Sequence, residues 1–193
     1  MFPTLTFYKK ILGDIVHYIA VKNNQIYTSI ELNTTPSGNC WVRHSVSHIS
    51  GQGYGLAMYK LAMADIYPFG IMPSREVTSG HAVALWQKLW HDTSLSKIAI
   101  TTDENYFFEA DEWLDEIASV NPSLDGAAIE ALEKNFSYLE AVQNNKITAH
   151  PYNHIYIAKE VNQPTIENAT QAHDHLFIEA EKLFYDRYET LDL

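Results

Sequence analysis

The sequence predicts a single domain of the mixed α/β class, with a central sheet that is covered by helices. Three observations support this prediction. Strand-like runs rich in β-branched and aromatic residues fill positions 14–49, a glycine-rich turn then opens a helical pattern, and strand-like runs return at 97–102 and 154–161. A chain of 193 residues, 46% of them hydrophobic, has the size of one globular core.

The first elements are a hairpin and a further strand. Two strand-like runs make up DIVHYIAVKNNQIYTSIEL (14–32), and Lys22-Asn23-Asn24 lies between them, where Asn tolerates the left-handed backbone of a tight turn. A loop follows at TTPSGN (34–39), and then a strand at CWVRHSVSHI (40–49). Regular alternation along that strand predicts one face with Val42, His44, Val46 and His48, and another with Trp41, Arg43, Ser45, Ser47 and Ile49.

The next elements are two helices with a short strand between them. Apolar residues recur at helical spacing from Gly55 to about Ile66, and no Pro or Gly interrupts them after the start. A short apolar run, FGIM (69–72), is a candidate strand. HAVALWQKLW (81–90) then has helical periodicity, with Thr78 or Ser79 as a candidate N-cap.

The rest of the chain alternates strands with acidic helices. KIAITT (97–102) and HIYIAKEV (154–161) are predicted strands, and between them residues 103–146 have the pattern of two amphipathic helices joined by NPSLDG. A charged helix is predicted in the C-terminal segment 165–193. We therefore expect one domain over residues 1–193, with 103–146 as a helical insertion.

Composition narrows the range of partners and compartments. The net charge of −11, without a Lys/Arg cluster, disfavours direct binding to nucleic acid. The acidity suits either an amine substrate or simple solubility.

Cys40 is the only cysteine, so no disulfide forms within the chain and a reducing compartment fits best. No apolar run approaches the roughly 20 residues that cross a bilayer, and the N-terminus does not resemble a signal peptide. We expect a cytoplasmic protein without a membrane partner.

The glycine-rich turn is the strongest local signal. In HISGQGYGLAMYKLAM (48–63), Gly51, Gly53 and Gly55 lie at the start of the predicted helix. Glycine permits positive φ and close approach of a ligand, and a helix start presents N–H groups without partners and the positive end of the helix dipole, so together they favour an anion. The pattern lacks the GK[ST] ending that binds nucleoside triphosphates and the spacing of the dinucleotide fingerprint. The alternative is a tight connection between strand and helix with no ligand.

Two motifs in residues 45–91 resemble the GNAT superfamily of acyltransferases. The segment Ser50-Gly51-Gln52-Gly53-Tyr54-Gly55 is similar to the family's [Q/R]-x-x-G-x-[G/A] at a helix start. Residues 79–91 are similar to a second motif, N-x-x-A-x-x-L-Y-x-K-x-G-F, with Ala82, Leu85 and Lys88 in register. MPSREVTSGHAVALWQKLW also looks like the divergent members found in phage genomes. The strong part of the resemblance covers about a quarter of the chain.

This resemblance implies a fold, a cofactor and a reaction. It implies a GNAT-like mixed sheet, splayed between the strand that ends near Ile49 and the next strand near 69–73, with helices on both faces and the pantetheine arm of acetyl-CoA in the gap. An amide near Val46 would polarise the thioester carbonyl, and the diphosphate would bind at residues 51–56. The expected cofactor-binding residues are Val46, Gly51, Gln52, Gly53, Tyr54, Gly55, Leu56 and Ser79. The implied function is N-acetyl transfer from acetyl-CoA to an amine of a small molecule or a protein.

Acyl transfer to an amine also needs a general base and a proton source for the thiolate. Glu31 on the hairpin and His44 on the central strand are the candidate bases. The family's tyrosine, the usual proton donor, is replaced by Trp86, and Tyr54, Tyr59 or water are the possible substitutes.

A second hypothesis follows from the departures at Ser50 and Trp86: a GNAT fold without catalysis that serves as a binding or assembly module, for example of a phage. The aromatic-rich segment EAEKLFYDRYETLDL (179–193) is a candidate surface for a homodimer. The run His173-Asp174-His175 suggests a metal, but adjacent side chains on a helix diverge, so we predict no zinc site there.

Overall fold

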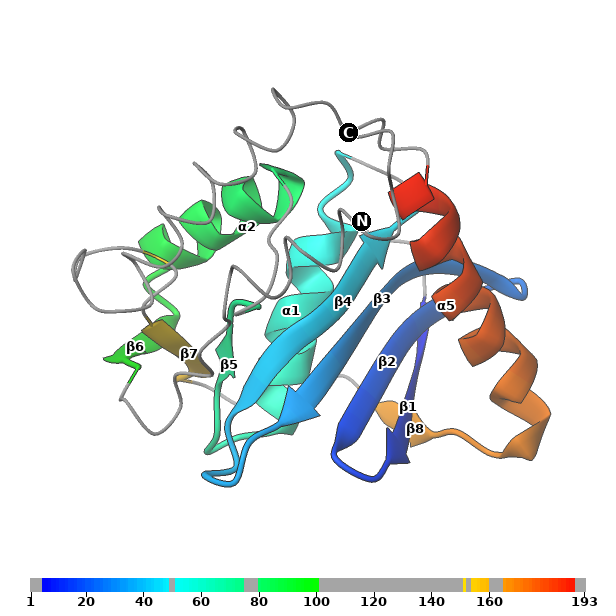
Figure 1. Ribbon diagram of the computed structural model, residues 1–193, viewed down its shortest axis with the longest axis horizontal. Helices are drawn as coiled ribbons and strands as arrows, with labels where there is room; N and C mark the ends of the chain where they lie inside the picture. The colour runs from blue at the N-terminus through cyan, green and yellow to red at the C-terminus, as the bar shows by residue number, and fades with distance from the viewer. Residues whose placement is uncertain are drawn as a thin grey trace, which may run out of the picture.

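The computed structural model describes residues 5–48, 51–74, 80–100, 151, 154–159 and 165–189. In this part of the chain, eight strands form one mixed sheet in the order β6-β7-β5-β4-β3-β2-β1-β8. The strands are β1 (Thr6–Leu12), β2 (Ile15–Lys22), β3 (Gln25–Thr34), β4 (Cys40–Ser47), β5 (Ile71–Met72), β6 (Leu95–Ala99), β7 (His154–Ala158) and β8 (Ile166–Asn168). The helices are α1 (Tyr54–Asp65), α2 (Gly80–His91) and α5 (Asp174–Glu189). Figure 1 shows α1 and α5 on opposite faces of the sheet, which confirms the predicted class.

The β2–β3 hairpin forms as predicted. Asn23 and Asn24 both have positive φ, 52° and 58°, as a tight two-residue turn requires. The pairing begins at Lys22 and Gln25, and it shifts by one residue between Ala20 and Val21. A hairpin register fixed by the turn is therefore changed partway along the strands, and this change decides which residues of β2 and β3 face each other.

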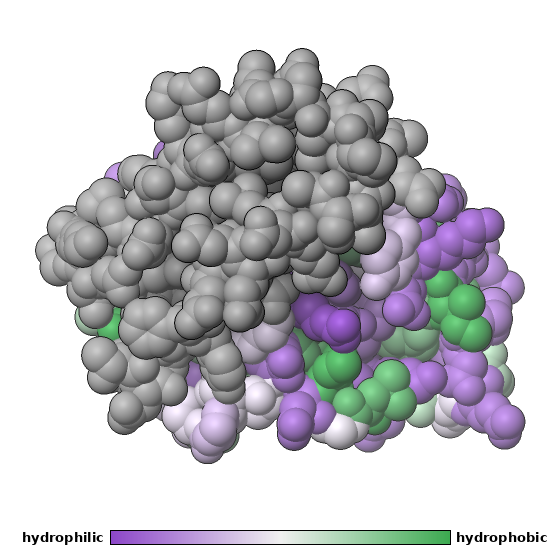
Figure 2. All heavy atoms as spheres, viewed as in Figure 1, coloured by the Kyte–Doolittle hydropathy of each residue, from purple (hydrophilic) through white to green (hydrophobic). Residues whose placement is uncertain are grey.

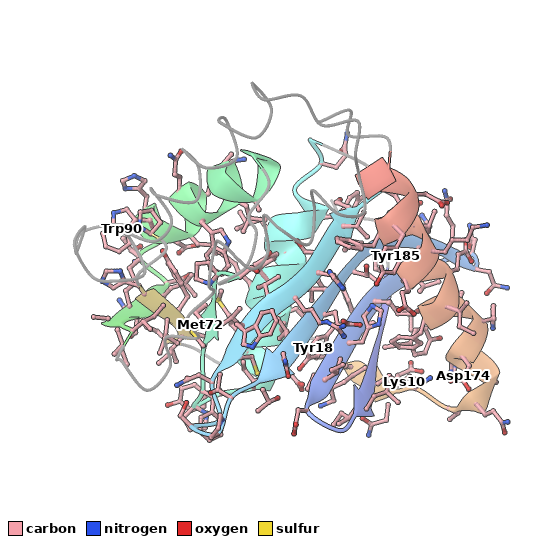
Figure 3. The ribbon with its side chains drawn as sticks, in the orientation of Figure 1. Lys10, Tyr18, Met72, Trp90, Asp174 and Tyr185 are labelled. Carbon is pink, nitrogen blue, oxygen red and sulfur yellow. The ribbon has the colours of Figure 1, made fainter. Side chains whose placement is uncertain are left out.

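β1 lies in a stretch for which the sequence pattern predicts no strand. It pairs along its whole length with β2 and, on its other edge, in parallel with β8. Two consecutive lysines interrupt its apolar pattern, and both have partners. Lys9 Nζ lies 2.8 Å from Asp65 at the end of α1, and Lys10 Nζ lies 2.7 Å from Asp174 at the start of α5. Figure 3 shows Lys10 and Asp174 side by side between the sheet and α5. The lysines therefore join the sheet to both helices.

β4 contains an extra residue that changes which side chains share a face. Glu31 of β3 pairs with His44, and Leu32 pairs with Val42, so Arg43 is the extra residue of a β-bulge. Because two residues of β4 then oppose one of β3, the alternation of side chains shifts by one at this point.

The regular alternation predicted for this strand is therefore wrong. Val42 packs in the core with α1, and Ser45 also faces α1, where it accepts a hydrogen bond from Tyr59. His44 lies on the opposite face, where its ring is 4.0 Å from the ring of Phe184 of α5, centroid to centroid. The bulge thus separates Val42 from His44, which the sequence pattern had placed together.

β4 and β5 are parallel but pair over a short length. Two residue pairs, Cys40–Ile71 and Trp41–Met72, join them within the described part of the chain. β4 continues well beyond Trp41, whereas β5 ends at Met72 and is followed by Pro73, which has no N–H for a ladder bond. In Figure 1 the two strands lie close together at the start of β4 and part toward its end, where α1 begins. The sheet is splayed at the carboxyl end of β4.

α1 is apolar on almost every side because the sheet and α2 both cover it. Its buried residues are Tyr54, Met58, Tyr59, Leu61, Ala62, Met63 and Ala64. All of them except Tyr54 belong, together with Trp86 and Leu89 of α2, to the main core under β2, β3 and β4. The rings of Tyr59 and Trp86 meet edge-on at 5.3 Å between centroids. Trp86 is therefore a core residue, 1% exposed.

α5 covers the other face of the sheet. Leu176, Phe177 and Ala180 of this helix pack with Ile19, Val21 and Ile26 of the hairpin. The predicted C-terminal helix is confirmed for Asp174–Glu189, whereas the residues before it form β8 and a single turn at Gln171–His173. Part of the segment expected to form a homodimer thus packs on the sheet of its own chain.

The other predicted elements agree with the structure to different extents. β5, α2 and β7 form where expected, and β6 begins at Leu95 rather than at 97. The residues expected to cap α2, Thr78 and Ser79, and the expected insertion at 103–146 lie outside the described residues.

The described surface has a mixed character. Among the described helices, none is long and apolar enough to cross a bilayer. Figure 2 shows hydrophilic and hydrophobic residues interspersed over the coloured part of one face. The exposed large hydrophobic residues come from different elements: Ile11, Leu12, Tyr67, Phe69, Ile98, Ile178 and Tyr185.

Candidate functional site

The glycine-rich turn begins α1 without a side-chain cap. Gly51 and Gly53 have φ of 77° and 80°, in the left-handed region that favours glycine. Gly53 is the N-cap residue, and it makes no side-chain cap hydrogen bond. The first bond of the helix runs from the Ala57 N–H to the Gly53 carbonyl at 3.0 Å. The N–H groups before Ala57 therefore have no acceptor within the helix itself.

The space in front of this turn differs from one glycine to the next. A Cβ added at Gly51 or at Gly53 would meet no described atom within 4 Å. A Cβ at Gly55 would lie 3.7 Å from Leu85 of α2 and 3.9 Å from the Cβ of Ser47. The first two glycines border space that holds no described atom, while the third allows α1 to pack closely between β4 and α2.

The outer edge of β4, defined here as the side of residues 42–47 that faces away from β3, lies next to this turn. The Cys40 N–H donates to Gly70 on the β5 side, whereas the His48 N–H donates to Tyr27 of the β3 side, each within 3.0 Å. Residues two apart on a strand direct their N–H groups to the same edge, so the Val46 N–H faces β3 and the Ser45 N–H faces the outer edge. The amide near Val46 that faces the outer edge is therefore that of Ser45, whereas the Val46 N–H itself faces β3.

Val46 and the remaining predicted binding residues have other surroundings. Val46 is buried, and its carbonyl accepts a hydrogen bond from the Thr28 hydroxyl at 2.9 Å. Gln52 is exposed in the turn, and Leu56 packs at the margin of the core. Tyr54 is buried with its ring against Tyr27, 5.4 Å between centroids. Ser79 lies outside the described residues.

The two predicted bases lie together on the face covered by α5. The Glu31 Oε1 is 4.0 Å from the His44 Nε2 and 3.1 Å from Arg43, and its Oε2 is 3.7 Å from the His17 Nδ1. The bulge places Arg43 and His44 both beside Glu31, because two residues of β4 there oppose one of β3. We call Glu31, Arg43, His44 and His17 the Glu31 cluster.

Burial sets the protonation of the Glu31 cluster. Burial, with the positive charge of Arg43, lowers the pKa of His44 to about 4. Burial also lowers the pKa of His17 to about 4, assisted by the nearby charges of His44 and Lys10. Burial raises the pKa of Glu31 against the opposing effect of Arg43. At neutral pH both histidines are therefore uncharged, and the carboxylate of Glu31 is a stronger base than an ordinary one.

α5 closes over one side of the Glu31 cluster. The His17 ring meets Phe177 edge-on at 5.1 Å, and the His44 ring lies against Phe184, with Tyr185 next to it at 6.1 Å between centroids. Figure 3 shows Tyr185 at the end of α5 that lies near the end of β4. The cluster is thus bounded by aromatic side chains toward α5.

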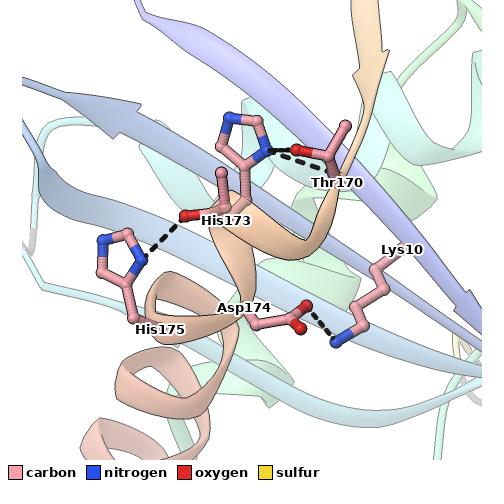
Figure 4. A network of polar contacts seen from close by, with 6 residues as sticks. Lys10, Thr170, His173, Asp174 and His175 are labelled. Carbon is pink, nitrogen blue, oxygen red and sulfur yellow. Dashed lines mark hydrogen bonds and ion pairs between the residues drawn. The ribbon is translucent and has the colours of Figure 1, made fainter.

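The run His173-Asp174-His175 has structural partners at the start of α5, as Figure 4 shows. The Thr170 N–H donates to the His173 Nδ1 at 3.1 Å, and the His175 Nδ1 lies 3.0 Å from the Ala172 carbonyl. Asp174 binds Lys10. These contacts fix the turn that leads into the helix.

Comparison of the chain with protein-family models, with curated proteins and with solved structures finds no match.

Proposed function

We propose that the protein binds acetyl-CoA at the splayed end of β4 and β5 and transfers the acetyl group to an amine. The observation that carries this proposal is the position of the uncapped start of α1, which lies beside the outer edge of β4 at the end where β4 and β5 part. In open sheets with helices on both faces, ligands bind outside the carboxyl ends of strands where the strand order reverses. In this sheet β3, which precedes β4 in the chain, lies on one side of β4, and β5, which follows it, lies on the other side. The strand order therefore reverses at β4.

The start of α1 suits a diphosphate. Its N–H groups and the positive end of the helix dipole favour an anion without any lysine or arginine, which fits a chain of net charge −11. Within the described part of the chain, the space beside Gly51 and Gly53 leaves room for phosphate oxygens. The two left-handed glycines hold the turn in a shape that other residues adopt only with strain.

The outer edge of β4 suits the thioester. A backbone N–H directed away from β3 donates to a carbonyl oxygen and becomes a stronger donor to the oxyanion that forms during attack. Ser45 supplies such an N–H, and its neighbour His44 belongs to the Glu31 cluster. A carbonyl bound at Ser45 would therefore lie within one residue of the candidate bases.

Glu31 is the better base of the two. A base must be unprotonated and basic enough to take a proton from an ammonium group. The lowered pKa of His44 makes its imidazole a weak base. The pKa of Glu31 is raised, so its carboxylate is a stronger base than an ordinary one. The acceptor amine approaches from the α5 face, and Glu31 removes its proton.

Calorimetry with coenzyme A tests the binding step. We expect stoichiometric binding by the wild-type chain and at least about tenfold weaker binding by Gly53→Ala, because a Cβ at this position enters the space of the phosphate. The loss of one hydrogen bond to a charged group, about 1.5 to 3 kcal/mol, accounts for a change of this size. Gly13→Ala is the matched control, since Gly13 also has positive φ, 61°, and open space, but lies in the β1–β2 turn. Equal affinities in both variants would reject the proposed phosphate site.

One observation favours the inert alternative, so catalysis needs its own test. Trp86 stands where the GNAT motif has a tyrosine, and it is buried between the rings of Tyr59 and Tyr156, so it offers no hydroxyl to the thiolate. Consumption of acetyl-CoA should be followed with amines, peptides and aminoglycosides as acceptors. Turnover with any of them supports the transferase, whereas tight coenzyme A binding without turnover in all three classes supports a binding or assembly module.

A further inference from the structure

A hydrogen bond links α1 to β4 beneath the proposed thioester position. The Tyr59 hydroxyl donates to the Ser45 Oγ at 3.1 Å. Tyr59 is only 2% exposed, and burial raises its pKa to about 12 despite the contact with Ser45. Tyr59 therefore keeps its proton at neutral pH and stays a donor to Ser45.

This arrangement leaves the proton of Ser45 available to another acceptor. A serine hydroxyl has one proton and two lone pairs, and Tyr59 occupies a lone pair. The Ser45 O–H must then point away from Tyr59. The Ser45 side chain lies on the α1 face, and its backbone N–H faces the outer edge of β4.

The proposed path of coenzyme A brings its sulfur to this hydroxyl. A diphosphate at the start of α1 lies on the same face of the sheet as the Ser45 side chain, so the pantetheine arm would enter from that face. A thioester carbonyl at the Ser45 N–H has its sulfur one bond from the carbonyl carbon, within reach of the hydroxyl of the same residue. The Glu31 cluster lies on the opposite face, on the side of the acceptor amine.

We propose that Ser45, oriented by Tyr59, donates a hydrogen bond to the sulfur of coenzyme A as the thioester breaks. This inference rests on the proposed function. In the step, the amine nitrogen forms a bond to the carbonyl carbon, and Glu31 takes the amine proton. The C–S bond breaks, and its electron pair goes to the sulfur. The thiolate is stabilised by the Ser45 O–H and later takes a proton from water, so Ser45 and Tyr59 keep their protons. Ser45 thus acts on the leaving group, and Tyr59 is a positioning residue.

The thiol pKa of bound coenzyme A tests the inference without an acceptor substrate. The complex is titrated by the ultraviolet absorbance of the thiolate, with the desulfo-coenzyme A complex as the blank. We expect Ser45→Ala and Tyr59→Phe to raise the pKa of the bound thiol by about one unit, which corresponds to one hydrogen bond to a charged group. Ser45→Thr keeps the hydroxyl and should restore the wild-type value. Affinity for desulfo-coenzyme A should stay unchanged in all three variants.

Tyr18→Phe is the matched control. Tyr18 is also buried and also donates a hydrogen bond to α1, at 2.8 Å to Asp65, but at the other end of the helix. It should leave the thiol pKa unchanged. If coenzyme A binds and the thiol pKa is the same in the wild type, Ser45→Ala and Tyr59→Phe, the inference is overturned while the proposed function stands. If the wild type does not bind coenzyme A, both are overturned.

Discussion

Glu31 and His44 lie directly opposite each other on β3 and β4, with 4.0 Å between Oε1 and Nε2. This distance is too long for a hydrogen bond, so neither side chain is committed to the other. Arg43 binds the same carboxylate at 3.1 Å and holds it in place. The pair therefore offers one oriented carboxylate and one neutral imidazole on the side of the sheet away from α1.

Replacement of the carboxylate should remove the base. We expect Glu31→Gln to lower the rate of acetyl transfer at least about 100-fold, the range of general-base catalysis, with coenzyme A affinity unchanged. In the wild type, the rate should fall as the pH decreases through the pKa of Glu31, which lies above its usual value, and the variant should lose this dependence. Initial rates between pH 5 and pH 9 measure it.

Glu167→Gln is the control for this change, since Glu167 is an exposed carboxylate on β8. It should keep the wild-type rate and pH profile. An unchanged pH profile in Glu31→Gln would assign the base to another group.

The protein should lose stability as the pH falls below neutrality. The pKa of His17 is about 4 when folded and near 6.5 when unfolded, so between these values the unfolded chain binds more protons. The free energy of unfolding therefore decreases as the pH falls through this window. For His17, which is 7% exposed, the loss between pH 7 and pH 5 is about 2 kcal/mol. Urea denaturation at both pH values measures it.

His17→Gln separates this contribution from the others, because glutamine is uncharged at both pH values. The variant should lose less stability between pH 7 and pH 5 than the wild type does. An identical loss in both proteins would show that His17 is not responsible.

The close contact of β5 and β7 depends on Gly70. A Cβ there would lie 2.5 Å from Ile155, 2.6 Å from Ile157 and 2.7 Å from the Tyr156 carbonyl, so the strands would have to move apart. We expect Gly70→Ala to destabilise the fold by about 2 to 3 kcal/mol and to lower Tm by roughly 4 to 12 °C. Gly13→Ala, with about 1 to 2 kcal/mol of backbone strain but no clash, should lower Tm less, by about 2 to 8 °C. Thermal unfolding followed by circular dichroism compares them, and equal shifts would contradict the predicted clash.

His173 caps the turn that leads into α5. Its Nδ1 accepts the Thr170 N–H at 3.1 Å, as the third residue of a capping box does. His173→Ala should cost about 1 kcal/mol, as the loss of a helix cap does, whereas His173→Gln supplies the usual residue of a capping box and should keep the stability. Hydrogen exchange of the first turn of α5 measures the difference. Equal protection in the alanine and glutamine variants would contradict this role.

The local elements could be predicted from sequence where periodicity or turn chemistry decided them. Asn23-Asn24 indicated the turn of the hairpin, and Gly51 and Gly53 indicated the turn before α1; all four residues have positive φ. β1 escaped prediction because Lys9 and Lys10 break its apolar pattern, and their partners, Asp65 and Asp174, lie far away in the chain. Long-range ion pairs leave no local signal.

The candidate site was predicted only in part because it depends on two shifts of register. Counted from the two-residue turn, His17 would pair with Ile30, but the irregularity at Ala20 and Val21 brings it opposite Glu31. The bulge at Arg43 brings His44 to the same carboxylate. The bulge also moves Ser45 to the α1 face, where it contacts Tyr59. Regular alternation of side chains along the strand does not predict this contact. Glu31 and His44 were identified, whereas Arg43, His17 and Ser45 were not.

The most direct test of coenzyme A binding at the start of α1 is an amide NMR titration of the ¹⁵N-labelled protein with coenzyme A. The proposed site predicts that the amide signals of Gly53, Gly55, Leu56 and Ser45 shift most, and that pantetheine, which lacks the diphosphate, moves Ser45 but not the three helix-start signals. Saturation of the protein with coenzyme A while these four signals stay in place would contradict the proposed site.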